Sequence, residues 1–235
     1  MIVAVEQPYF LPYIGYWQLL NAVDVFVILD DVNYIKRGFI NRNNILLDGK
    51  SYRFSIPVQD ASQNRLIMDT RICLYEREKQ KFLSRIEYAY RKAPQYLQTY
   101  PIIKDIINNE EEDLTEFIQY SLLAIAKRLG ITTEIIKSSA LGKDNSFTGQ
   151  KRVIEICKQV KADTYINPIG GRKLYDKFFF NRENIALFFL DTRHENIVYP
   201  QFNNAFVNML SIIDIMMFNP IEKIQKFLEE YDLNE

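Results

Sequence analysis

The residues with the most evident potential for chemistry lie in the segment QPYFLPYIGY, residues 7–16. Two prolines interrupt the chain there, and a helix is predicted to begin near Pro12, so its first N–H groups are unpaired and suited to an anion. Gly15, in the first turn, would let a ligand or another backbone approach closely. The predicted ligand-binding side chains are Gln7, Tyr9, Tyr13 and Tyr16. The alternative is that the prolines shape an ordinary turn and the aromatic rings fill the core.

A second polar segment, DDVNYIKRGFINRNN at residues 30–44, gathers carboxylates, cations and amides around aromatic residues. Guanidinium groups hold phosphate through paired hydrogen bonds, and the residues predicted to bind a nucleotide here are Arg37, Asn41 and Arg42. Asp30 and Asp31 end a predicted strand, where only one can face a ligand and orient a ribose, bind Mg²⁺ or act as a base. The catalytic candidates are therefore Asp30, Asp31 and Lys36. The alternative is a solvated surface loop.

A third segment, INPIGGRKLYDKFFF at residues 166–180, carries a Gly-Gly pair after a predicted strand. Gly170 and Gly171 are a weak phosphate-loop signal, with Tyr175 alongside, and an ordinary turn is the alternative. Gln201, in the nearby YPQF sequence, could add a polar and aromatic wall. His194 has no nucleophile at a recognisable motif, so no catalytic triad is predicted.

The elements that would position these segments alternate between strands and helices. Apolar runs predict buried strands at 2–6, 25–29, 132–139, 164–169 and 185–191, with intervening helices at 14–23 and 148–160. A hairpin turns at Asp48-Gly49, helices are predicted at 76–92, 97–108 and 113–128, and two more at 209–218 and 219–231. We predict one α/β domain over 1–235 with a Rossmann-like, mainly parallel sheet and helices on both faces. Residues 76–130 would be a helical insertion or covering layer, and helices would end the chain.

The order of the elements predicts where the three segments meet. In open α/β sheets, ligands bind beyond the carboxyl ends of the strands, and each of the three polar segments follows such an end. We therefore expect them to converge on one crevice that binds a small molecule.

Composition limits the classes of function. The formal net charge is −1, and three cations in one loop are a thin footprint for nucleic acid, so nucleic-acid binding is not expected. Cys73 and Cys157 stand in no metal-binding spacing and are expected to be reduced, and with one His the sequence predicts no zinc site. No metal ligand is assigned. The absence of a targeting pattern and of a membrane span predicts a cytoplasmic protein.

Several motifs together resemble the WbqC-like family of bacteria. They are QPYFLPYIGYWQLLNAVD, DDVNYIKRGFINRN, IPV, the Gly-Gly-x-x-x-Tyr segment and YPQF followed by LSIIDIMMFN, and they extend over nearly the whole chain. The resemblance implies a role in the synthesis of O-antigen and other surface polysaccharides. It also implies transfer of an aminoacyl group, for which glycine has been suggested, to an amino sugar.

A second, weaker resemblance is to the His-x-Gly-His nucleotidylyltransferase superfamily, which includes ligases that adenylate a carboxylate. The similar feature is a strand, a Pro-containing loop, Tyr13-Ile14-Gly15-Tyr16, a helix and a strand. The resemblance implies a nucleotide against the helix start, with Tyr13 and Tyr16 where that superfamily has histidines. A phenol has a pKa of about 10 and supplies no positive charge, so Lys36, Arg37, Arg42 or Mg²⁺ would have to provide it.

Two functions follow from the sequence. The first is a transferase or amide ligase that joins an aminoacyl or acyl group to the amino group of a nucleotide-linked sugar. The donor would be a free amino acid with ATP and Mg²⁺, or an already activated acyl group, and the cofactor is left open. The alternative is a non-catalytic protein that binds a sugar nucleotide, since stacking and hydrogen bonding suit recognition.

Overall fold

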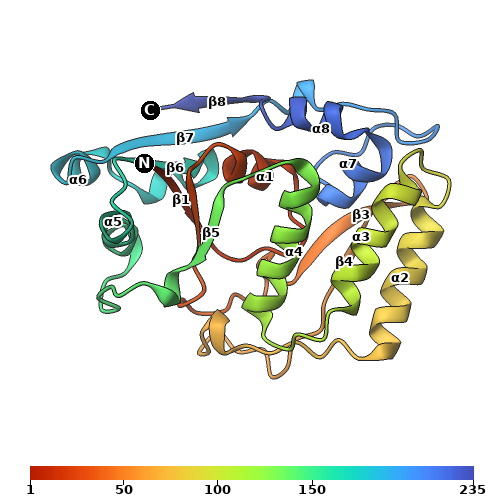
Figure 1. Ribbon diagram of the computed structural model, residues 1–235, viewed down its shortest axis with the longest axis horizontal. Helices are drawn as coiled ribbons and strands as arrows, with labels where there is room; N and C mark the ends of the chain where they lie inside the picture. Colours follow the sequence, from red (N-terminus) through yellow and green to blue (C-terminus); the bar gives the residue numbers. More distant parts are fainter.

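A computed structural model describes residues 1–235. Six strands form one sheet (Figure 1), in the order β5 (Glu134–Lys137), β2 (Val25–Ile28), β1 (Ile2–Glu6), β6 (Thr164–Pro168), β7 (Ala186–Thr192) and β8 (Tyr231–Asn234). The first five are parallel, and β8 pairs antiparallel with β7. The prediction of a mainly parallel α/β sheet is confirmed.

Helices cover both faces of this sheet (Figure 1). Because successive strand residues point to opposite faces, Val3 and Val5 join α5 (Gly149–Gln159) and α6 (Lys177–Arg182) in one core cluster. Ala4, between them, joins the larger cluster with α1 (Ile14–Asn21) and α4 (Leu114–Leu129). The continuous apolar runs of the strands reflect burial on both faces.

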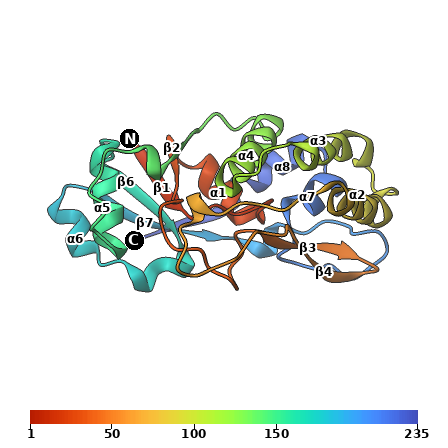
Figure 2. The ribbon, with the colours of Figure 1, turned by 90° about the horizontal axis from the view of Figure 1, so that it is seen from below.

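The middle of the chain forms a helical layer beside the sheet. Here α2 (Glu76–Tyr90), α3 (Tyr96–Asn108) and α4 lie side by side (Figure 1), and the prediction of a helical middle segment is confirmed. The hairpin of β3 (Arg42–Leu47) and β4 (Lys50–Ser55) lies beneath α2 and α7 (Ile212–Phe218) in Figure 2, and its Asp48-Gly49 turn has positive φ at both residues. These elements share the larger core cluster with α1.

The end of the chain differs from the prediction. The last helix, α8 (Ile221–Phe227), stops earlier than expected, and the chain then turns into β8. Pairing with the open edge of β7 supplies backbone hydrogen bonds that one more helical turn would otherwise provide. Local helical periodicity does not register such a distant partner. No helix in the protein is both long and apolar enough to cross a bilayer.

The strand order identifies the point at which a ligand would bind. From β1 the chain moves to one side through β2 and β5, and later returns to the other side through β6 and β7. The connections therefore diverge between β1 and β6, which opens a crevice at the carboxyl ends of these two strands.

Candidate functional site

A cleft of about 350 Å³ opens at this switch point. Its walls come from all three polar segments identified in the sequence, so the predicted convergence is observed. The lining residues are Glu6, Gln7, Pro8, Tyr9, Tyr13, Tyr16, Gly38, Phe39, Ile40 and Pro168.

Glu6 is the only carboxylate in the cleft lining, and it was not among the residues predicted from the sequence. It is the last residue of β1, and its Oε1 accepts a hydrogen bond of 3.1 Å from Asn167 Nδ2 at the end of β6. Burial raises the pKa of Glu6 from 4.5 to about 7, partly offset by this hydrogen bond. The feature of the sequence that could have identified Glu6 is a carboxylate at the end of an otherwise apolar strand. A carboxyl group with this pKa can gain or lose a proton near neutrality.

Asn167 is held in place by the third predicted segment. Its Nδ2 also donates to the Tyr165 hydroxyl at 2.7 Å, and the hydroxyls of Tyr165 and Tyr175 are 3.4 Å apart. A Cβ on Gly171 would lie 2.0 Å from Asn167 Oδ1, whereas a Cβ on Gly170 would meet nothing within 4 Å. The structure therefore places Gly171 and Tyr175 behind Glu6, as packing for Asn167, and Gly170 at an open surface position.

Aromatic rings form the walls of the cleft. Tyr9 lies edge-on to Tyr16, with ring centroids 5.9 Å apart, and is tilted against Phe39 at 5.6 Å. The Tyr16 hydroxyl donates a 3.2 Å hydrogen bond to the carbonyl of Gln7, which fixes the loop after β1. Burial raises the pKa values of Tyr9, Tyr13 and Tyr16, so all three phenols are neutral at physiological pH.

Tyr13 occupies the space that its neighbouring glycine leaves open. A Cβ on Gly15 would lie 2.5 Å from the Tyr13 hydroxyl oxygen, so Gly15 accommodates this ring. The other neighbour of the ring is His194, stacked at a centroid distance of 6.5 Å after the end of β7. The Nδ1 of His194 is buried and has no hydrogen-bond partner.

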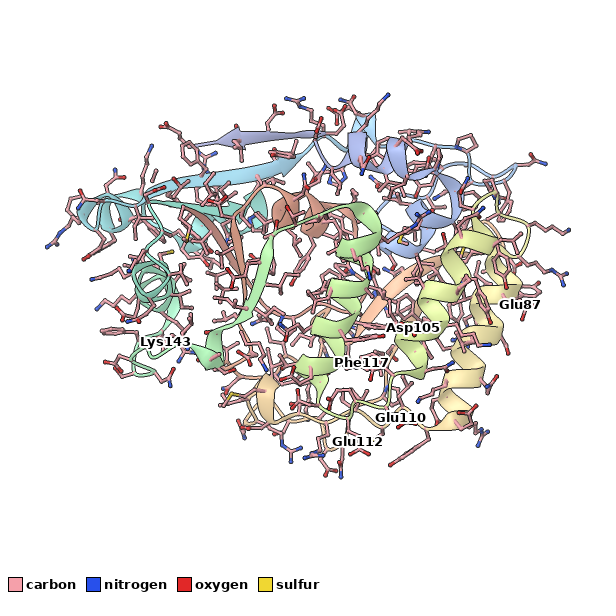
Figure 3. The ribbon with its side chains drawn as sticks, in the orientation of Figure 1. Glu87, Asp105, Glu110, Glu112, Phe117 and Lys143 are labelled. Atoms are coloured by element: carbon pink, nitrogen blue, oxygen red, sulfur yellow. The ribbon has the colours of Figure 1, made fainter.

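Asp30 and Asp31 are buried beside β5 and do not line the cleft. Asp30 accepts hydrogen bonds from the backbone N–H and the hydroxyl of Ser139, at 2.9 and 2.6 Å. Asp31 accepts from Ser138 at 2.8 Å and forms an ion pair with the almost completely buried Lys143, in the loop between β5 and α5 (Figure 3). Burial would raise the pKa of Asp31, but hydrogen bonds from Lys143 and Ser138 lower it overall. Lys143 was not predicted as a partner of Asp31, because it lies 112 residues further along the chain.

The loop at residues 34–42 contributes both free and bound polar groups. Lys36 and Arg37 are exposed and precede the lining residue Gly38. The Arg42 guanidinium donates to the carbonyl of Gly38 at 2.5 Å and to that of Arg37, so it closes the loop from within. Asn41 connects the loop to the residue after β4, because its side chain donates to the carbonyl of Ile56 at 2.6 Å. Of the predicted phosphate ligands, Lys36 and Arg37 have free side chains.

Gln201 lies in a separate buried network. It donates to Asp214 at 2.6 Å, alongside the hydroxyls of Tyr90 and Tyr199 at 2.8 and 2.7 Å. Burial raises the pKa of Asp214 to about 6, while these three donors lower it. Gln201 is not among the residues that line the cleft.

Together, the sheet and cleft define an α/β protein with a candidate ligand site at the switch point of a mainly parallel sheet. A family model, the WbqC-like protein family, matches residues 7–226, and the chain belongs to this family. It is also similar to the uncharacterized protein Rv1507c of Mycobacterium tuberculosis, with 27% identity over 216 residues, covering 91% of this chain and 92% of that protein. No solved structure matches significantly.

Proposed function

We propose that this protein transfers an aminoacyl or acyl group to the amino group of a nucleotide-linked amino sugar, in the synthesis of a surface polysaccharide. The observation that carries the proposal is Glu6, a carboxyl group at the switch point with its pKa raised to about 7. A general base works best when its pKa is near the working pH and it can reach the proton it removes. The amine would be the nucleophile, and glycine is one candidate for the transferred group.

The proposed step is an acyl transfer. The amine nitrogen attacks the carbonyl carbon of the activated donor, the new C–N bond forms, and the bond to the leaving group breaks with its electron pair. Glu6 accepts the proton that the nitrogen loses and then protonates the leaving group or releases the proton to water. Asn167 would act as a positioning residue, because it donates to Glu6 Oε1 and leaves Oε2 without a hydrogen bond from the protein.

The residues that line the cleft favour one of the two ways in which the donor could be activated. Its lining contains no Lys or Arg, and both Asp30 and Asp31 are engaged by other residues. A triphosphate with Mg²⁺ needs cations and free carboxylates, so these residues do not fit ATP within the cleft. Phosphates of a bound nucleotide would instead contact the exposed Lys36 and Arg37. This arrangement favours the version in which the donor arrives already activated.

A non-catalytic sugar-nucleotide-binding protein is the second candidate. The packed rings of Tyr9, Tyr16 and Phe39 favour it, because aromatic walls bind sugars and bases whether or not a reaction follows. The two candidates share a ligand and differ only in turnover.

The test combines binding with product analysis. The protein is incubated with UDP- or dTDP-linked amino sugars and either glycine, ATP and Mg²⁺ or a glycyl or acetyl thioester, and products are measured by mass spectrometry. The expected product is the sugar nucleotide with one added acyl group, and AMP would appear only in the adenylating version. Glu6→Gln should abolish transfer, while Glu110→Gln, at an exposed carboxylate without a partner (Figure 3), should not. Binding without any product would favour the second candidate, and no binding of any sugar nucleotide would refute both.

A further inference from the structure

The lining of the cleft carries negative charge only. Glu6 is its only lining residue that ionises near neutral pH, and the lining contains no Lys, Arg or His. The remaining polar side chains are an amide, from Gln7, and neutral phenols. The faces of aromatic rings carry negative electrostatic potential, so the rings add to the effect of the carboxylate. A phosphate or a carboxylate would be repelled here, and a cation would be attracted.

The geometry of the cleft suits a small cation. Tyr9 packs against Tyr16 and Phe39, with ring centroids 5.9 and 5.6 Å apart, and these rings line the cleft together with Glu6, so a cation at the carboxylate would lie near an aromatic wall. Glu6 Oε1 is occupied by Asn167, and Oε2 is free to accept a hydrogen bond from a ligand. A primary ammonium group has three N–H donors and one positive charge, and it can satisfy the carboxylate and the ring faces together.

We infer that the cleft binds the protonated amino group of its ligand and discriminates against the same group once it is acylated. This inference deepens the proposed function, since it names the chemical form in which the acceptor enters. An ammonium group that binds Glu6 can transfer one proton to Oε2, which leaves a neutral amine and a neutral carboxylic acid. Glu6 then releases this proton to water, so that its carboxylate can accept the second proton, which the nitrogen loses as it is acylated. An amide carries no charge and is larger, so it loses both the ion pair and the cation–π contact. The acylated product would therefore leave the site readily.

A matched set of sugars tests this without any knowledge of the natural ligand. Glucosamine, glucose and N-acetylglucosamine differ only at carbon 2, and their binding is measured by NMR titration at pH 7.5. We expect glucosamine to bind at least about tenfold more tightly than the other two, as a hydrogen-bonded charge contact would give. Equal binding of glucosamine and glucose would overturn the inference.

Variants separate the contributions of charge and ring. Glu6→Gln should remove the preference for glucosamine over glucose. Phe39→Leu should weaken glucosamine binding by roughly three- to tenfold through loss of the cation–π contact. Phe178→Leu, which replaces an exposed ring that does not line the cleft, is the matched control and should change nothing. A preference for glucosamine that persists in Glu6→Gln would refute the role of the carboxylate.

The same measurement with UDP-glucosamine, UDP-glucose and UDP-N-acetylglucosamine distinguishes the inference from the proposed function. If all three bind equally, the nucleotide-sugar site is supported and the ammonium inference is wrong. If glucosamine is preferred while neither UDP- nor dTDP-sugars bind, the ammonium inference holds and the nucleotide-linked substrate is wrong.

Discussion

Replacing Glu6 with Gln should stabilise the protein at neutral and alkaline pH, even though it removes the proposed base. Glu6 binds its proton more tightly in the folded chain, where its pKa is about 7, than in the unfolded chain, where it is near 4.5. Stability therefore falls as the pH rises between these two values, because the folded carboxyl must ionise in a partly buried site. Gln at this position has no such charge. It can still accept a hydrogen bond from Asn167 through its side-chain oxygen.

The expected size follows from the two pKa values. Raising the pKa of Glu6 from 4.5 to about 7 corresponds to about 3 kcal/mol of unfavourable ionisation in the folded state. Below pH 4.5 the carboxyl is protonated in both states, so the wild type and Glu6→Gln should have similar stabilities. Above pH 7 the variant should be more stable by up to about 3 kcal/mol. Urea unfolding at half-unit intervals from pH 4 to 8 measures the difference directly.

The difference between the two proteins removes contributions from other groups. Asp214 also has a raised pKa, about 6, and weakens the fold over a similar pH range, but it does so in both proteins. Glu110→Gln controls for the loss of one surface carboxylate. Parallel stability curves for the wild type and Glu6→Gln from pH 4 to 8 would refute the raised pKa, and with it the assignment of Glu6 as a base near neutrality.

Two further predictions concern the groups around the cleft. Gly171→Ala should lower the free energy of unfolding, measured in urea, by about 1–3 kcal/mol, because the new Cβ would lie 2.0 Å from Asn167 Oδ1 and would push Asn167 away from its hydrogen-bond partners. Gly170→Ala should change it by no more than about 0.5 kcal/mol. Equal losses in both variants would contradict the packing role of Gly171. Lys143→Met should cost about 3 kcal/mol, since it removes the closest ion-pair partner of the buried Asp31 carboxylate and leaves only Arg152, at 3.8 Å. A loss below about 1 kcal/mol by the same measurement would show that Arg152 and the remaining donors suffice.

Most of the helices and strands could be predicted, because the spacing of apolar residues within each segment indicates its secondary structure. The runs at 2–6 and 25–29 are apolar on both faces, and the helices of residues 76–130 repeat at helical spacing, so neither needs information from distant residues. The strand β8 could not be predicted, because it exists through pairing with β7 across the chain. Strand order, and hence the exact position of the switch point, also depends on tertiary packing.

The site shows the same division between local and distant information. The loop after β1 was identifiable because its prolines and tyrosines depart from the needs of a plain turn, and four of its predicted residues line the cleft. The roles of Asp31 and Gly171 depend on partners more than three residues away, so their types alone could not reveal them. Asp31 was predicted as a base, but it forms a buried ion pair with Lys143, which is 112 residues away in the sequence. Asn167 makes Gly171 a packing position behind Glu6.

The tyrosines at 13 and 16 bear on which ligand the cleft can accept. The ring of Tyr13 fills the space above Gly15, so a ligand meets a phenol there and not the backbone of the helix start. The raised pKa values of both phenols keep them neutral, and they cannot balance the charge of a triphosphate. With Glu6 as the one lining group that ionises near neutral pH, exchanging imidazoles for phenols would change the preference of such a site from anion to cation. The residues that argue against adenylation in this cleft are therefore the ones that favour binding of an amine.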